Sequence, residues 1–140
     1  LQEIVSHFPN WTIEEADGLW CAAFVYHCVK KAGFVLPVRP TNCAAGSLAG
    51  CLSWEQLALA DPRITYIKGS DPAFLPLRGD IVLFDRVFED KEHDHMGIVL
   101  AVSDTTITTA EGNVNNMSAI LERPRDIHIR AVIRMINGLT

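Results

Sequence analysis

The sequence predicts an α+β domain, because the signals for helices come first along the chain and the signals for strands follow them. Between residues 20 and 28 the apolar side chains have the i, i+4, i+5, i+8 spacing of a buried helical face: Trp20, Phe24, Val25 and Cys28. From Tyr66 onward the apolar stretches become short and are separated by turn residues, as strands are. The chain has 140 residues, 49% of them hydrophobic, with no internal repeat or linker, so we expect residues 1–140 to form a single domain.

Two helices are expected near the start of the chain. Thr12 followed by Glu15 has the form of a capping box, which predicts the start of a short helix just after it. Asp17 is expected to be the N-cap of the next helix, which runs to about Ala32 and has Gly33 as its stop signal. This second helix carries the apolar face described above.

A long loop is predicted over residues 37–51, which are rich in proline, glycine and asparagine. We expect this loop to form one wall of a substrate groove, because long connections inside compact domains often carry function. A further helix is predicted to begin at Ser53 and to end at Asp61-Pro62.

The second half of the chain predicts an antiparallel meander. The expected strands are residues 81–84, 96–102, 105–110 and 127–135. In the last of these, apolar residues alternate with His128, Arg130 and Arg134, so this strand is expected to have one buried face and one solvent-exposed face.

Composition excludes two classes of partner. The net charge is −5, the sequence pI is about 5.4, and no basic stripe is present, so nucleic acid is not an expected partner. No apolar run reaches the roughly 18 residues that a membrane helix needs, so no membrane span is expected. The chain opens on Leu1 without an apolar leader, which leaves two explanations: a removed leader, or a domain from a longer chain.

Four cysteines are present, and no two of them form a CxxC motif, so a structural zinc site is not expected. Cys28 lies two helical turns after Cys21 among apolar neighbours and is expected to be a small buried hydrophobe. Cys43 and Cys51 flank a loop rich in glycine and alanine. Either a disulfide between them in an oxidising compartment or a free pair fits the sequence, with the free pair as the default.

Cys21 is a candidate nucleophile because it is expected in the first turn of its helix. The unpaired backbone N–H groups and the helix dipole there favour a thiolate, which lowers the thiol pKa below the free value of about 8.5. The same N–H groups can stabilise an oxyanion formed when the thiolate attacks a carbonyl. The alternative is that Cys21 is one more core residue of the apolar face.

His95 is the candidate general base. It is expected at the start of a strand, at the rim of the core, where an imidazole is both held and reachable. The alternative for His95 is a solvent-facing histidine that closes a polar loop. The pattern His93-Asp94-His95 also allows a metal site, but no further ligand is evident by spacing, so we expect His93 to belong to the loop and no metal to bind.

Glu111 and Asn113 follow the strand predicted over residues 105–110 and flank Gly112. A carboxylate or amide at this position can accept a hydrogen bond from the imidazole Nδ1–H and fix the tautomer of His95. The alternative is ordinary turn chemistry, which explains Gly112 and Asn113 better than it explains Glu111.

Four motifs together resemble the CHAP domain family: Asp17–Val25 (DGLWCAAFV), Arg78–Phe84 (RGDIVLF), His95–Val99 (HMGIV) and Glu111–Asn113 (EGN). This family comprises cysteine, histidine-dependent amidohydrolases/peptidases that are related to the NlpC/P60 enzymes within the papain-like group. The resemblance covers roughly residues 14 to 116. It implies a papain-like α+β fold in which the nucleophile helix packs on an antiparallel sheet.

The resemblance also implies roles for the candidate residues. Cys21 is the implied nucleophile, His95 the base, Glu111 the residue that orients the imidazole, and Asn113 a further polar group of the site. No cofactor is implied. Some family members carry an acidic calcium loop before the cysteine, but this chain lacks a convincing loop spacing there, so we expect no calcium site.

The implied substrate is peptidoglycan or a peptide, cut either at the N-acetylmuramoyl–L-alanine amide or within the peptide part. Such an enzyme is expected to be secreted, periplasmic or associated with the cell wall, in bacteria or phage, with any wall-binding or targeting segment outside the given sequence. The alternatives are an acyl transferase on the same scaffold and a module that binds cell wall or protein without catalysis.

Overall fold

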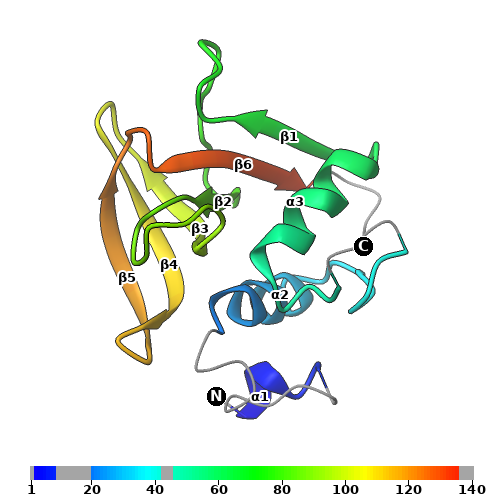
Figure 1. Ribbon diagram of the computed structural model, residues 1–140. Helices are drawn as coiled ribbons and strands as arrows, with labels where there is room; N and C mark the ends of the chain where they lie inside the picture. The colour runs from blue at the N-terminus through cyan, green and yellow to red at the C-terminus, as the bar shows by residue number, and fades with distance from the viewer. Residues whose placement is uncertain (1, 9–19, 42–45, 136–140) are drawn as a thin grey trace.

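The computed structural model describes residues 2–8, 20–41 and 46–135 of the chain. Helices α1 (Gln2–Val5), α2 (Cys21–Lys31) and α3 (Cys51–Ala60) come first. The strands follow them: β1 (Ile64–Lys68), β2 (Ile81–Phe84), β3 (His95–Val102), β4 (Thr106–Val114), β5 (Met117–Pro124) and β6 (Ile129–Met135). Figure 1 shows the helices gathered on one side of the sheet. The predicted α+β class, with helices packed on an antiparallel sheet, is confirmed.

The six strands form one sheet in the order β1-β6-β2-β3-β4-β5, and every neighbouring pair is antiparallel. The strands from β2 to β5 follow the chain as a meander, whereas β6 returns to lie between β1 and β2. The sheet is strongly twisted, so β1 and β6 run across the direction of β4 and β5 in Figure 1. Because β2 is an inner strand, all four of its residues are buried, which explains its continuous apolar sequence.

The sheet has a buried cluster of side chains on each face. On the helix side, Ile81, Leu83 and Met96 pack with apolar residues of α2 and α3, including the fully buried Trp54. On the other side, residues of β2, β3, β4 and β6 form a smaller cluster: Val82, Phe84, Val99, Ile107, Ile129 and Val132. The two-residue period of the strands therefore decides which side chains face the helices.

Helix α2 begins at Cys21, with Trp20 as its N-cap. The prediction that Asp17 caps this helix is therefore wrong, and Asp17 itself lies outside the described residues, as does the capping box expected at Thr12. At the other end, Lys30 and Lys31 occupy the last turn, where cations interact favourably with the helix dipole. Gly33 follows with a φ of +97°, a backbone conformation that glycine adopts without a steric penalty.

Several predicted boundaries need correction, and some elements were not predicted. Helix α3 begins at Cys51, two residues before the predicted start at Ser53. The strand predicted over residues 105–110 extends to Val114, so Glu111 and Asn113 lie within β4 rather than after it. Helix α1 and strand β1 were not among the predicted elements. Strand β5 was not predicted either, because its apolar and polar residues, at the exposed edge of the sheet, give only a weak alternating pattern.

Only part of the long loop predicted over residues 37–51 is described. Its two ends are joined by a backbone hydrogen bond from the N–H of Leu48 to the carbonyl of Val38. Leu48 is fully buried in the helix-side cluster, and Cys51 at the end of the loop starts α3. Among the described residues, no helix combines the length and the hydrophobicity needed to cross a membrane.

Gly112 is predicted to be needed for the contact between α2 and β4. A Cβ at this position would lie 2.7 Å from Cγ of Phe24 and 2.8 Å from Cζ3 of Trp20. Gly112→Ala should therefore lower the free energy of unfolding by about 1–3 kcal/mol, the usual cost of overpacking a core. Chemical denaturation measures this loss. Gly50→Ala is the matched control, because a Cβ there meets nothing closer than 3.7 Å; an equal loss in both variants would contradict the prediction.

Candidate active site

A small cavity of about 90 Å³ brings together three of the four residues singled out from the sequence. Cys21, His95 and Asn113 line it, together with Phe88, Glu89, Lys91 and Asp94. Cys21 comes from the first turn of α2, His95 from the start of β3, and Asn113 from the end of β4. Glu111, the fourth residue, lies behind the imidazole of His95 and not in the cavity lining.

The imidazole of His95 is only 2% exposed and is held on three sides. Its Nε2 lies 2.6 Å from Oε1 of Glu111. The ring of Phe84 stacks on it at a centroid distance of 6.0 Å, and the ring of Phe88 meets it edge-on at 4.7 Å. We expected Glu111 to accept a hydrogen bond from Nδ1 of His95, which is wrong, because the carboxylate lies against Nε2 instead.

Glu111 is completely buried, and its charge is satisfied from several sides. Arg123 on β5 donates from Nε to Oε2 at 2.5 Å and from Nη2 to Oε1 at 2.7 Å. The Thr109 hydroxyl also donates to Oε2. Burial alone would raise the pKa of Glu111, but the hydrogen bonds from Arg123, His95 and Thr109 lower it to about 2. The group beside His95 is therefore a carboxylate.

Two backbone features let Glu111 reach His95. A Cβ on Gly97 would lie 2.8 Å from Cγ of Glu111, so the side chain of Glu111 passes over the space that a larger residue at position 97 would fill. The pairing of β4 with β5 shifts register between Glu111 and Val114, and Asn113 in this irregular stretch has a φ of +60°. Such bulges redirect side chains near sites, and here Glu111 faces His95 while Asn113 faces the cavity.

The pKa values of Cys21 and His95 are shifted in opposite directions. Hydrogen bonding to Cys51, and then to His95, holds the pKa of the buried Cys21 thiol well below its ordinary value, although burial opposes this. Burial lowers the pKa of His95, but hydrogen bonds to Cys21 and Glu111 outweigh it and raise that pKa to about 9. These shifts favour a thiolate beside an imidazolium over a wide range of pH.

One wall of the cavity is the loop over residues 87–89, which hydrogen bonds to Asp94 hold in place. Oδ2 of Asp94 accepts hydrogen bonds from the backbone N–H groups of Val87, Phe88 and Glu89, at 2.7 to 3.1 Å. Phe88 and Glu89 both line the cavity, and the carboxylate of Glu89 pairs with Lys91 at 3.1 Å. The charged residues before His95 therefore form a defined wall of the site.

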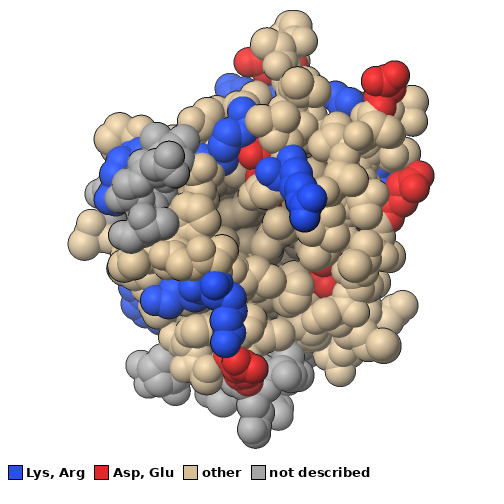
Figure 2. Space-filling model, turned by 180° about the vertical axis from the view of Figure 1, so that it is seen from behind, with Lys and Arg blue, Asp and Glu red and all other residues tan. Residues whose placement is uncertain are grey.

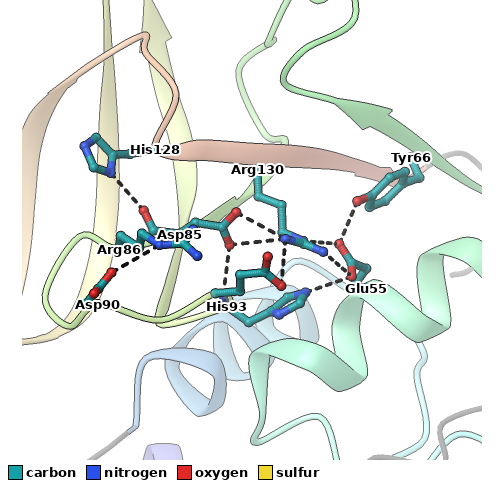
Figure 3. Close-up of polar contacts among 9 residues, drawn as sticks. Glu55, Tyr66, Asp85, Arg86, Asp90, His93, His128 and Arg130 are labelled. Carbon is teal, nitrogen blue, oxygen red and sulfur yellow. Dashed lines mark hydrogen bonds and ion pairs between the residues drawn. The ribbon is translucent and has the colours of Figure 1, made fainter.

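His93 belongs to a different polar cluster (Figure 3). Its Nε2 lies 2.7 Å from Oε1 of Glu55 on α3, and Oε2 of Glu55 accepts hydrogen bonds from Tyr66 and Arg130 at 2.6 and 2.7 Å. Arg130 also reaches Asp85 at 3.2 Å. The cluster ties α3 to β1 and β6.

In the described part of the chain, no group of three or more histidine, cysteine, aspartate or glutamate residues is arranged to hold a metal ion. The stretch before the cysteine, where a calcium loop was considered, lies outside the described residues.

A second hollow, of about 420 Å³, lies between the C-terminal half of α2, the turn that leads into β2 and the end of β6. The face seen from behind in Figure 2 is hollowed near its centre, with basic side chains around the rim. Cys28 contributes to this hollow, and burial raises the pKa of its thiol. No imidazole lines it, so Cys28 and Cys21 lie in environments of opposite kind.

Sequence reasoning missed Arg123 and Cys51. Arg123 lies on β5, the strand that was not predicted, and pairs in register with Ile107, which shares a face of β4 with Thr109 and Glu111. An alternating pattern over residues 117–124 was the signal that could have found it. The sulfur of Cys51 lies 3.7 Å from that of Cys21, a contact between distant segments for which the sequence carries no local signal.

A helix that begins at a buried thiol, beside a histidine on an antiparallel sheet, defines an α+β protein of the papain-like kind. Comparison with known families matches residues 13–113 to the CHAP domain. No curated protein and no solved structure matches the chain. Because the match covers more than half of the sequence, the chain belongs to the CHAP domain family. CHAP domains are generally cysteine-dependent hydrolases and are typically extracellular.

The buried charge of Glu111 is predicted to set the pKa of His95. Glu111→Gln keeps the shape but removes the charge that stabilises the imidazolium, so the pKa of His95 should fall from about 9 by roughly one unit or more. Titration of the histidine ring protons by NMR measures this shift. Glu122→Gln, the same change at an exposed position on β5, should leave the His95 titration where it is; an unchanged titration in Glu111→Gln would contradict the prediction.

Proposed function

We propose that the chain is a cysteine-dependent amide hydrolase of peptidoglycan, acting either as an N-acetylmuramoyl-L-alanine amidase or as an endopeptidase of the peptide part. The observation that carries the proposal is the shared cavity of Cys21 and His95, with the charged carboxylate of Glu111 behind the imidazole. This is the arrangement that nucleophilic catalysis needs: a thiol, a base within reach of it, and a third group that orients the base. Membership of the CHAP family and the typically extracellular location of that family support peptidoglycan as the proposed substrate.

In the proposed mechanism, Cys21 starts as a thiolate and His95 as an imidazolium. The lowered pKa of Cys21 and the raised pKa of His95 support this charge state. The thiolate attacks the amide carbonyl. Trp20 supplies no side-chain cap to the first turn of α2, so backbone N–H groups at that end are available to the oxyanion.

The remaining steps return the site to its starting state. His95 donates a proton to the leaving amine, which departs and leaves a thioester on Cys21. His95 then takes a proton from water, which attacks the thioester and releases the acid. Glu111 holds the imidazole through Nε2 and balances its positive charge during both steps. Asn113, at the cavity wall, is positioned to bind a polar group of the substrate.

Cys21→Ala tests the nucleophile. It should lower peptidoglycan hydrolysis by at least about 10³-fold while leaving the circular dichroism spectrum unchanged, and Glu111→Gln should cause a smaller loss. The measurement is mass spectrometry of fragments and new amines released from purified peptidoglycan, which also identifies the bond cut. Cys28→Ser, a change at the other cysteine of α2, should keep full activity.

The outcomes of this experiment separate the proposal from its rivals. Full activity of Cys21→Ala would exclude the proposed mechanism. Products that incorporate an added amine would identify an acyl transferase, because the thioester would then be captured by the amine instead of by water. Binding to peptidoglycan with no fragments from the unmodified protein would identify a module that binds without catalysis.

The pH dependence of hydrolysis should report the pKa of His95. His95 must be protonated to donate to the leaving amine, so kcat/KM should fall as the pH rises through about 9. Steady-state rates on a soluble peptidoglycan fragment, measured upward from about pH 6, show this fall as the basic limb of the profile. The series begins there because about pH 6 is close to the ordinary pKa of histidine. In Glu111→Gln the limb should move to lower pH. A limb that stays at the same pH in that variant would assign it to another group.

A further inference from the structure

Two cysteine sulfurs meet at the edge of the cavity. Sγ of Cys21 and Sγ of Cys51 are 3.7 Å apart, and both side chains are buried. Each residue is the first of its helix, Cys21 of α2 and Cys51 of α3, so the two helices direct their N-terminal ends at one point. Both thiols are free. The mechanism proposed above uses only Cys21 and leaves the neighbouring thiol without a chemical role.

The two sulfurs differ in their protonation. Hydrogen bonding to Cys51 and to His95 lowers the pKa of Cys21 well below its ordinary value. Hydrogen bonding to Cys21, followed by burial and the charge of Cys21, raises the pKa of Cys51 well above it. The pair is therefore a thiolate that accepts a hydrogen bond from a thiol. A thiolate that lines a cavity is the form of cysteine that peroxides oxidise most readily.

We propose that Cys21 and Cys51 are a site of reversible oxidation, at which a peroxide converts the pair to a disulfide. In the first step the Cys21 thiolate attacks one oxygen of hydrogen peroxide, the O–O bond breaks, and the sulfur becomes a sulfenic acid while hydroxide leaves and takes up a proton. In the second step Cys51 sulfur attacks Cys21 sulfur, the S–S bond forms, the S–O bond breaks, and hydroxide leaves with the proton of Cys51 as water. Two thiols and one peroxide thus give one disulfide and two water molecules.

The geometry favours the second step. A disulfide has an S–S bond of about 2.05 Å, so the sulfurs need to approach by only about 1.7 Å from their present 3.7 Å. The first step also removes the negative charge of Cys21, which is one of the causes that keep Cys51 protonated. Cys51 therefore becomes easier to ionise once its partner has been oxidised.

The consequence for activity rests on the proposed function. A sulfur held in a disulfide cannot attack a carbonyl, so oxidation should stop hydrolysis. Because the second sulfur captures the sulfenic acid, Cys21 is protected from the irreversible sulfinic and sulfonic states. A dithiol such as dithiothreitol should return the pair to two thiols and restore the activity.

The test is to treat the purified protein with hydrogen peroxide and to measure its intact mass and its cross-linked peptides. The expected result is the loss of two hydrogen atoms, a peptide that joins Cys21 to Cys51, and loss of peptidoglycan hydrolysis. Dithiothreitol should restore both the original mass and the hydrolysis. Cys28→Ser, the matched control on α2, should behave in the same way. Cys51→Ser should gain oxygen on Cys21 instead, with no recovery by dithiothreitol once the sulfinic acid has formed.

The mass measurement does not depend on the substrate, so it separates this inference from the proposed function. A cross-linked peptide after peroxide, in a protein that does not hydrolyse peptidoglycan even when fully reduced, would support the disulfide and refute the function. Hydrolysis by the reduced protein, combined with oxygen gain on Cys21 and no cross-link after peroxide, would support the function and overturn the disulfide. A cross-link between Cys43 and Cys51 in place of the Cys21–Cys51 peptide would also overturn it.

Discussion

The buried carboxylate of Glu111 is the constraint on which the rest of the site depends. A charge with no exposure to solvent is stable only when nearby donors compensate for the lost hydration. Arg123, Thr109 and His95 provide these donors, and they come from β5, β4 and β3 respectively. The pairing of three adjacent strands therefore fixes one carboxylate, and the carboxylate in turn fixes the orientation and charge of the imidazole.

A second buried carboxylate performs a comparable task for the helices. Glu55 binds Arg130 of β6 and Tyr66 of β1, which locks α3 against the far half of the sheet. Since Cys51 is the first residue of α3, this contact also determines where its sulfur lies relative to Cys21. The surroundings of the thiolate are thus set partly by the cluster around Glu55, which lies one helical turn along α3 from Cys51 (Figure 3).

Helices α2 and α3 and the inner strands were predictable because their patterns are local: the spacing in α2 and the apolar run of β2 are read within one segment. Cys21 and His95 were found for the same reason, as each lies at the end of such an element. The partners of Glu111 were harder to predict. Arg123 is on an edge strand with a weak pattern, and the choice of Nε2 over Nδ1 depends on how β3 and β4 pack. The contact of Cys51 with Cys21 could not be predicted, because it depends on the relative position of two helices, and no local sequence pattern encodes that position.

Strand β6 has a bearing on where the domain ends. The segment that identifies the family stops at residue 113, yet Arg123 and the whole of β6 come after it. β6 lies inside the sheet, between β1 and β2, so a fragment cut at residue 113 would separate β1 from the other strands and leave the carboxylate of Glu111 buried without its guanidinium partner. The cooperative folding unit therefore extends at least to Met135, beyond the stretch of sequence by which its ancestry is recognised.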